Sequence, residues 1–283
     1  MPSDDVAHYY DRNTRRFLMM GSGRVGHTMH RELWGPGIES AREAADHINR
    51  VIADEIAGVN LGPQPTIVDF GSGVGGTLFH LAERFPTARL SGITVSRRQV
   101  EIAERLTRQL GYSDRCSFLL GDFQTTNLEL SADAIVAVES FVHSDSMDAF
   151  LANASKHLRQ GGHLIIADDF LVSEKDSLSA DQRLRVEQFQ AGWRVPAVCT
   201  AESLVEAAAK HGFGADKSVD LTSLTRPGSR VRDRVTAALS PLLVRLGLGR
   251  IPFYGNLIGG NALQIGLRDG LLQYRLLVFR NGA

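Results

Sequence analysis

The feature that most constrains this chain is a glycine-rich turn that follows a short β-branched segment. Residues 66–76 read TIVDFGSGVGG, with an acid just before the turn and a helical pattern after it. Glycine lacks a Cβ, so such a turn lets a nucleoside cofactor lie against bare backbone. The N–H groups of the turn and of the following helix N-terminus suit a ligand carboxylate. This segment predicts a strand–turn–helix unit of a nucleotide-binding α/β fold.

The glycine pattern alone is compatible with several cofactors. Gly71, Gly73 and Gly76 match G-x-G-x-x-G, which nicotinamide, flavin and S-adenosylmethionine sites share. A nicotinamide site wants an acid about 20 residues farther on, at the end of the second strand. Residues 89–96 read RLSGITVS and hold no acid there. Asp69 lies instead where a carboxylate can meet a cationic amine, which favours S-adenosylmethionine.

Three segments together resemble the class I S-adenosylmethionine-dependent methyltransferases. They are VDFGSGVG at 68–75, GITVS at 92–96 with Gln99, and GDF at 121–123. The GITVS form is similar to the branch that methylates carbon, namely sterol, cyclopropane-fatty-acid and prenyl diphosphate methyltransferases. HYYD at 8–11 and GLLQYRLLVF at 270–279 also resemble that branch. The resemblance implies an α/β fold with a doubly wound, mostly parallel seven-stranded sheet and helical lid segments.

The apolar periodicity predicts alternating strands and helices, as expected of a parallel α/β sheet. We expect strands at 66–70, 88–95, 116–120, 133–138 and 163–168, and helices from 76 and at 97–110 and 146–158. Farther on, we expect a helix over 201–211, a strand over 217–224 and an antiparallel edge strand over 271–280.

Three segments lie outside this predicted core. We expect residues 1–60 to form a helical substrate arm and 61–283 to form the cofactor-binding domain, with lid insertions at 171–200 and 226–262. The stretch 229–247 places aliphatic side chains on one helical stripe, which Pro241 would kink. A helix packed on the core is favoured there over a membrane-surface or substrate gate.

Composition and charge exclude several classes of protein. With 43% hydrophobic residues, the 283-residue chain can bury the core of one elaborated domain. The net charge of −1 argues against a general nucleic-acid partner. The two cysteines lack the spacing of a zinc site or disulfide framework, so we expect no protein-bound metal. With no signal peptide or membrane-length apolar stretch, we expect a cytoplasmic protein without stable membrane insertion, and leave a homo-oligomer open.

The resemblance implies the cofactor-binding residues. Asp69, Gly71 and Gly73 would hold the methionine end, Thr94 and Gln99 would lie near the ribose, and Asp122 with Phe123 would receive the adenine. Ser72 and Ser96 are counted among the same cofactor-binding residues. Ser96 is also placed to cap the helix that follows it. Asp122 has an alternative role as an ordinary turn residue after a strand.

The predicted fourth strand ends in Glu139, and His143 follows. Ligands of doubly wound sheets lie outside the carboxyl ends of strands, so Glu139 should face the transferable methyl group. In prenyl and sterol methyltransferases, a similarly placed Glu is regarded as the base that removes a proton after alkene methylation. The alternative is a carboxylate that only orders the cofactor pocket. His143 is a candidate base for an oxygen or nitrogen nucleophile, or a locally hydrogen-bonded side chain.

From Arg12 to Arg31 the chain has five arginines and no acid. The planar guanidinium donates two hydrogen bonds at once, which suits phosphate. We therefore expect an acceptor phosphate to be bound by this basic arm, with Arg15, Arg16, Arg24, His30 and Arg31 as candidates. A solvated basic face, anionic lipid or nucleic acid are the alternatives.

Aromatic residues are the remaining candidates. Methyl transfer to an alkene creates a carbocation, which ring faces within ~6 Å stabilise without trapping it. In prenyl diphosphate methyltransferases an N-terminal Tyr and a Phe after the fifth strand are thought to serve in this way. Tyr10 and Phe170 match those positions, with Tyr9 as an alternate to Tyr10, and Trp193 is expected to contact the substrate.

Taken together, these residues predict a C-methyltransferase of terpenoid biosynthesis. It would transfer a methyl group from S-adenosylmethionine to an alkene carbon of a prenyl diphosphate, such as isopentenyl or geranyl diphosphate, and Glu139 would take the proton. Mg²⁺ could accompany the diphosphate. The alternatives are a C-methyltransferase of a neutral terpenoid, terpenoid-indole or sterol-like product, a small-molecule O- or N-methyltransferase, and a non-enzymatic binding module.

Overall fold

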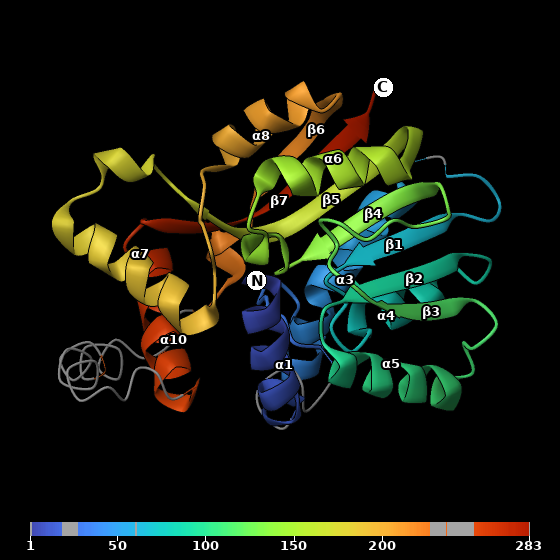
Figure 1. Ribbon diagram of the computed structural model, residues 1–283, viewed down its shortest axis with the longest axis horizontal. Coiled ribbons are helices and arrows are strands. Elements are labelled where there is room, and N and C mark those ends of the chain that lie inside the picture. Colours follow the sequence, from blue (N-terminus) through green and yellow to red (C-terminus); the bar gives the residue numbers. More distant parts are fainter. Residues whose placement is uncertain (1, 19–27, 60, 227–235, 237–251, 283) are drawn as a thin grey trace.

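A seven-stranded sheet runs through the molecule in the order β3-β2-β1-β4-β5-β7-β6 (Figure 1). The computed structural model describes residues 2–18, 28–59, 61–226, 236 and 252–282. The parallel strands are β1 (Thr66–Phe70), β2 (Arg89–Thr94), β3 (Cys116–Leu120), β4 (Ala132–Val138) and β5 (Leu158–Leu171). β7 (Leu272–Asn281) pairs antiparallel with both β5 and β6 (Phe213–Asp220). The expected doubly wound, mostly parallel α/β sheet is confirmed.

Helices cover both faces of this sheet. On one face lie α3 (Ala41–Ala57), α4 (Gly76–Arg84) and α5 (Arg97–Leu110), and on the other lie α6 (Met147–His157) and α8 (Ala201–Lys210). The two larger apolar clusters follow this division, with Ile48 and Ile52 of α3 in one and Phe150 of α6 in the other. The central strand β1 is buried on both sides, and its residues are apolar except Thr66 at its start and Asp69 near its carboxyl end.

Side-chain caps fix where these helices begin. Ser96 accepts a hydrogen bond from the Gln99 N–H, so α5 begins directly after β2, as the sequence predicts. Ser40 and Glu43 form a reciprocal capping box at the start of α3. The left-handed Gly111 ends α5.

Four further helical elements lie beside the carboxyl edge of the sheet. α1 (Pro2–Leu18) packs against α5, and α7 (Ala180–Trp193) packs against α10 (Pro252–Arg268). A short 3₁₀ turn, η1 (Phe141–His143), follows β4. Figure 1 shows α1, α7 and α10 on the same side of the molecule, away from α6 and α8.

The C-terminal part of the sheet differs from the expectation in two ways. β7 is not an edge strand, because β6 pairs along its outer side. β6 begins at Phe213, because the chain reverses at Gly212 (φ 83°) directly after α8. Residues Thr222–Leu224 form a 3₁₀ turn instead of the expected end of that strand.

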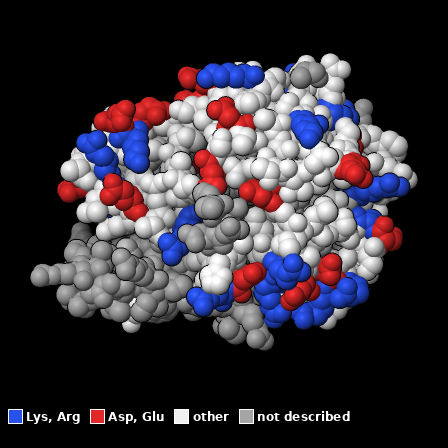
Figure 2. Space-filling model, viewed as in Figure 1, with Lys and Arg blue, Asp and Glu red and all other residues white. Residues whose placement is uncertain are grey.

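The visible surface mixes charges of both signs. Arg and Glu side chains alternate along α5, at the lower right of Figure 2. No helix in the described ranges is both long enough and apolar enough to cross a membrane. The apolar stripe expected over 229–247, with Pro241, lies outside the described residues.

Candidate active site

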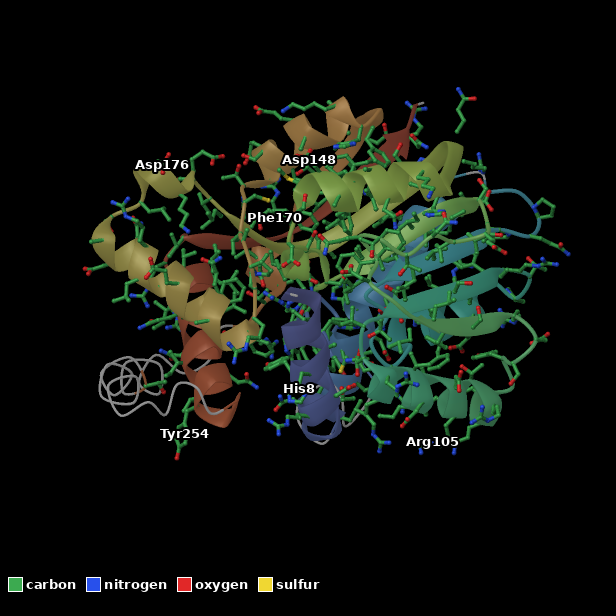
Figure 3. The ribbon with its side chains drawn as sticks, viewed as in Figure 1. His8, Arg105, Asp148, Phe170, Asp176 and Tyr254 are labelled. Carbon is green, nitrogen blue, oxygen red and sulfur yellow. The ribbon has the colours of Figure 1, made fainter. Side chains whose placement is uncertain are left out.

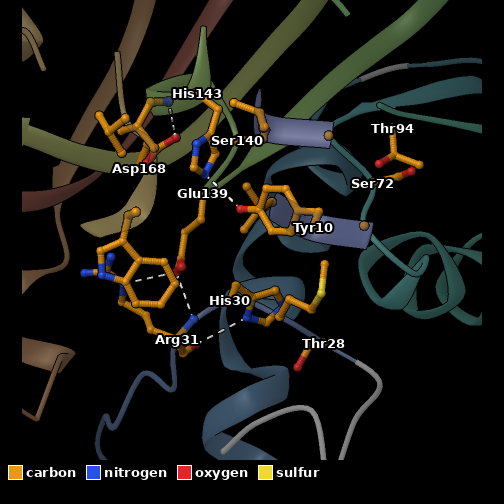
Figure 4. Close-up of a pocket in the computed structure, with 18 of the residues that line it drawn as sticks. Tyr10, Thr28, His30, Arg31, Ser72, Thr94, Glu139, Ser140, His143 and Asp168 are labelled. Carbon is orange, nitrogen blue, oxygen red and sulfur yellow. Dashed lines mark hydrogen bonds and ion pairs between the residues drawn. The ribbon is translucent and has the colours of Figure 1, made fainter. Parts of the chain in front are cut away.

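A cavity of about 300 Å³ lies at the carboxyl ends of β1, β4 and β5. Its walls come from the glycine-rich turn, the end of β2, the β4–η1 junction, residues 28–31, α1, α7 and α10. This is the place where ligands bind in doubly wound sheets. Figure 4 shows its residues converging from elements far apart in the sequence.

One half of the cavity is shaped by the glycine-rich turn. Gly71 and Gly73 have φ angles of 91° and 55°, a left-handed conformation that L side chains rarely adopt. A Cβ on Gly71 would lie 2.3 Å from the Cβ of Ser140. The turn therefore needs glycine for both its backbone shape and the close approach of Ser140. Ser72 also lines this half.

Asp69 is the buried acid of this half. Its side chain lines the cavity, and no hydrogen bond to it is found among the described residues. Burial raises the pKa of Asp69 to about 7. A buried carboxylate without a cation is unstable alone, so this position suits the amine of a ligand. The bare turn and Asp69 together fit the amino acid end of S-adenosylmethionine.

The wall beside β2 places the expected ribose and adenine residues. Thr94 and Gln99 line the cavity, and the Thr94 hydroxyl donates to Gln99 Oε1. Phe123 also lines the cavity, 7% exposed, and stacks on Phe70. These side chains leave an apolar and amide-lined wall that suits a nucleoside.

Two expected cofactor residues, Ser96 and Asp122, make local hydrogen bonds and do not line the cavity. Ser96 is fully buried, caps α5 and donates to Asp11 of α1, so it does not line the cavity. Asp122 also lies off the cavity, where its Oδ1 accepts from the Gln124 N–H at 2.8 Å. This contact fits the alternative role of Asp122 in the turn after β3, and its expected contact with the adenine stays a prediction.

Asp11 is a residue that the sequence reasoning missed. Its Oδ1 accepts hydrogen bonds from Ser96 Oγ and from the Arg98 N–H at 3.1 Å. A carboxylate is stabilised at a helix N-terminus, so Asp11 fastens α1 to the start of α5. This contact brings Tyr10, the residue before it, to the cavity.

The other half of the cavity holds Glu139, directly after β4. Glu139 has φ 50°, and its N–H donates to Ala167 O at 2.8 Å. A non-glycine residue in this conformation is strained by about 1–3 kcal/mol, which the surrounding structure must offset. Glu139 lines the cavity with its side chain 21% exposed. The strand end therefore presents a carboxylate to the ligand space.

Arg31 pairs with Glu139 and Asp169. Its N–H and Nε donate to Glu139 Oε1 at 2.9 and 3.0 Å, and Nη2 donates to Asp169 Oδ2. Although burial opposes the charge, the two carboxylates raise the pKa of Arg31, which stays a cation. The Arg31 guanidinium is thus paired with two carboxylates, and its expected contact with an acceptor phosphate stays a prediction.

The other members of the basic arm are only partly described. His30 is buried, lines the cavity, and its Nδ1 lies 3.3 Å from the Arg31 carbonyl. Burial lowers the pKa of His30, so it is neutral near pH 7. The side chains of Arg15 and Arg16, and the whole of Arg24, lie outside the described residues.

The two N-terminal tyrosines point in different directions. Tyr10 lines the cavity, and its hydroxyl lies 2.9 Å from Nε2 of His143, which lines it too. Tyr9 lies outside the cavity lining and donates to Asn256 Oδ1 of α10 at 2.7 Å. Tyr10 is therefore the tyrosine at the ligand space.

Of the other aromatic candidates, Trp193 lines the cavity and Phe170 does not. Phe170 is fully buried and stacks on Phe141, in the cluster under α6 and α8 (Figure 3 labels it on β5). Its side chain thus packs on the other face of the sheet, which corrects the expectation that it faces the acceptor. Phe189 of α7, which sequence reasoning did not single out, lines the cavity beside Trp193.

Asp168 is a second buried acid at the end of β5. Its two oxygens accept from the N–H groups of Val142 (3.1 Å) and Asp169 (2.8 Å). Burial, with the nearby Asp169 charge, raises the pKa of Asp168 well above its usual range. The described residues include no cluster of three or more metal-ligating side chains.

Comparisons with known proteins agree with this geometry. A family model described as a methyltransferase domain matches residues 68–164. The chain is 30% identical to an O-methyltransferase of Pyrenophora dematioidea over 233 residues, 81% of this chain and 83% of the relative. It is 26% identical to a sterol 24-C-methyltransferase of Debaryomyces hansenii over 77% of this chain, but spans only 56% of that relative.

Solved structures share the fold. A geranyl diphosphate methyltransferase in complex with GPP and sinefungin superposes with a TM-score of 0.77 at 20% identity, over 99% of this chain and 100% of the other. At that identity the likeness shows the fold alone.

Proposed function

Because the chain belongs to the class I S-adenosylmethionine-dependent methyltransferases, we propose that it methylates an alkene carbon of a small apolar acceptor, with prenyl diphosphates as the substrate class. The observation that carries this proposal is the position of Glu139, a carboxylate at the end of β4 in a cavity walled by Trp193, Phe189 and Val195. A proton acceptor among apolar and aromatic walls suits an acceptor that becomes cationic.

S-adenosylmethionine supplies an electrophilic methyl group. The protein's residues bind the cofactor, stabilise the cation, accept the proton and exclude water. Asp69 and the glycine-rich turn bind the amino acid end. As the bond between the methyl group and its sulfur breaks, the acceptor alkene gains a carbon–carbon bond and takes over the positive charge, which the faces of Tyr10 and Trp193 stabilise. Glu139 accepts the proton whose loss restores the double bond. Apolar walls exclude water, which would otherwise trap the cation.

The diphosphate is the finer part of the proposal. Arg31 is already paired with two carboxylates, so a phosphate would depend on Arg15, Arg16 and Arg24 of the basic arm. The geranyl diphosphate methyltransferase named above is similar over the whole chain, which supports this acceptor class. Mg²⁺ would be held mainly by diphosphate oxygens, since the described residues offer no cluster of ligands for it.

We also propose that different elements of the chain bind the cofactor and the acceptor. The sheet with α4 and α5 carries the cofactor half of the cavity. Residues 28–31, α1, α7 and α10 cover the acceptor half and act as its lid. Of the substrate arm expected over 1–60, α1 and residues 28–31 would contact the acceptor, while α3 packs into the core.

O-methylation is the second candidate, and His143 favours it. Burial lowers the pKa of His143, so the ring is neutral near pH 7 and its Nε2 lies at the cavity as a proton acceptor. The O-methyltransferase relative named above supports the same activity. In this reaction an acceptor hydroxyl would lose its proton to His143, and Glu139 would not be needed as a base.

A product screen separates these reactions. The enzyme is incubated with S-adenosylmethionine and isopentenyl, dimethylallyl, geranyl or farnesyl diphosphate, or with the matching free alcohols, and products are identified by mass spectrometry after phosphatase treatment. A gain of one methylene unit with the terminal hydroxyl retained supports C-methylation. Methyl ethers from the free alcohols support O-methylation. If only the alcohols gain carbon-bound methyl groups, the diphosphate proposal is wrong.

A further inference from the structure

We propose that Arg31 is a positioning residue that fixes the Glu139 carboxylate in the cavity, a proposal that rests on Glu139 being the proton acceptor. Arg31 comes from a segment that precedes β1, whereas Glu139 follows β4 and Asp169 lies near the end of β5. Figure 4 shows Arg31 beside Glu139. One side chain from the lid thus bridges two carboxylates of the sheet.

The hydrogen bonds explain how Arg31 orients Glu139. Both the backbone N–H and Nε of Arg31 donate to the same oxygen, Oε1. The other oxygen, Oε2, receives no hydrogen bond among the described residues. Two donors on one oxygen fix the rotation of the carboxylate and leave Oε2 to take a proton.

The acidic side chains around the cavity explain why Glu139 needs Arg31 to hold its position. Asp168, Asp169 and Glu139 all border the cavity, and Arg31 is the cation that contacts two of them. The Arg31 guanidinium also lies over the Tyr274 ring, with Cζ 4.2 Å from the ring centroid, and this cation–π contact helps to hold it. Without Arg31, repulsion between Glu139 and Asp169 would turn the Glu139 side chain away from its present position.

The fork of Arg31 is what the geometry uses. Nε and Nη2 point to two different carboxylates, and a lysine ammonium on a flexible stem cannot reproduce that pair of directions. Arg31→Lys therefore keeps the charge but loses the positioning. Arg98→Lys is the matched control, because the Arg98 side chain makes only an exposed ion pair with Glu101 among the described residues.

The first test measures the contact between Arg31 and Glu139 and does not depend on catalytic activity. Hydrogen–deuterium exchange is followed in the ligand-free protein for a peptide covering residues 28–34. Glu139→Ala removes the acceptor of the Arg31 N–H, and Arg31→Lys removes the guanidinium fork. In both variants the exchange rate of this peptide should therefore rise tenfold or more. In Arg98→Lys, the peptide covering 28–34 should exchange as in the wild type. In Glu139→Ala and Arg31→Lys, a control peptide covering 97–110 should also exchange as in the wild type. Unchanged exchange in both cavity variants overturns the proposal.

The second test measures positioning during turnover. At saturating S-adenosylmethionine with geranyl diphosphate and geraniol as probes, Arg31→Lys and Glu139→Gln should each lower kcat about tenfold or more. The double variant should be no slower than the worse single variant, because both changes act through one carboxylate. If the kcat loss in the double variant equals the product of the two single losses, the proposal is overturned. It is also overturned if Glu139→Gln is slow but Arg31→Lys keeps the wild-type kcat. If Glu139→Gln itself keeps wild-type kcat, the alkene reaction is wrong, and the exchange experiment alone decides whether Arg31 holds Glu139.

Discussion

The Tyr10 hydroxyl lies 2.9 Å from Nε2 of His143, and this pair joins α1 to the turn after β4. On its other side, Nδ1 of His143 lies 3.3 Å from the Arg194 carbonyl. A carbonyl oxygen only accepts hydrogen bonds, so Nδ1 carries the ring proton. Nε2 is then the acceptor for Tyr10, and burial keeps the ring neutral by lowering its pKa.

The first prediction separates the ring of Tyr10 from its hydroxyl. If the ring face stabilises a cationic acceptor, Tyr10→Phe should keep kcat within about threefold of wild type. Tyr10→Ala should lower kcat roughly 2- to 30-fold, since a cation–π contact is worth ~0.5–2 kcal/mol. Tyr9→Phe, which removes the hydroxyl that donates to Asn256 outside the cavity lining, is the matched control for steady-state kinetics.

The opposite pattern would favour the hydrogen bond over the ring. If Tyr10→Phe is as slow as Tyr10→Ala, the hydroxyl on Nε2 is the important group. His143→Gln would then be expected to abolish turnover, as O-methylation requires.

The second prediction concerns the protonation of Asp69. Its pKa of about 7 means that the folded, ligand-free chain holds a proton that the unfolded chain releases near pH 4. The free energy of unfolding therefore falls as pH rises from about 4 to 7, because the buried charge has no partner. Asp69→Asn should raise the Tm of the ligand-free protein at pH 8 and change it little at pH 4.5.

Cofactor binding should show the reverse dependence on pH. The ionised carboxylate pairs with the ligand amine, so S-adenosylhomocysteine should bind about tenfold more weakly at pH 6 than at pH 8. Asp69→Asn should weaken binding by roughly 1.5–3 kcal/mol and remove the pH dependence. Calorimetry at the two pH values checks both; equal affinities in the wild type would mean that Asp69 does not meet the amine.

The third prediction compares two left-handed glycines. Gly111 has φ 76° and open space around its Cβ position, so Gly111→Ala should cost only the backbone strain, about 1–2 kcal/mol. Gly71→Ala should cost about 1–3 kcal/mol more, because its Cβ would lie 2.3 Å from that of Ser140. Urea denaturation measures both variants. A similar loss in the two would show that Ser140 yields to the new methyl group.

Much of the fold could be predicted from the sequence, because its signals are local. The Ser96 cap, the apolar spacing and Gly111 fix α5 within its own segment, and the expected bounds 97–110 match the structure. β6 begins four residues before its expected start, because its first residues after Phe213 are exposed and carry no apolar pattern, and pairing with β7 includes them in the strand. Pairing between distant strands leaves no mark in either segment alone.

The candidate site shows the same limit. Asp69 and the glycines were recognisable because a turn of consecutive residues forms them. The Arg31 bridge was not, since Glu139 lies 108 residues away and Asp169 lies 138 residues away. Phe170 was assigned to the cavity because the sequence does not show which face of β5 meets the acceptor. Asp168 and Asp169 both line the cavity, whereas Phe170 lies with Ile166 in the core cluster under α6 and α8.

The last prediction concerns acceptor size and the crossing of α7 with α10. Gly260 of α10 lines the cavity, and a Cβ there would lie 3.8 Å from Trp193, an ordinary contact. Gly260→Ala and Gly260→Val should therefore fold with nearly unchanged Tm but narrow the acceptor half. We expect kcat/KM to shift from farnesyl toward isopentenyl diphosphate, more strongly for Val than for Ala.

Gly259, one residue earlier, is the contrasting position. A Cβ there would lie 2.8 Å from the Gly192 Cα and 3.0 Å from Trp193, so Gly259→Ala should force the two helices apart. We expect a loss of roughly 1–3 kcal/mol in stability, with KM raised for every acceptor rather than a change in preference. Measuring Tm and the ratio of kcat/KM values for the two diphosphates separates the effects. If Gly260→Val leaves that ratio unchanged, the acceptor does not extend between α7 and α10.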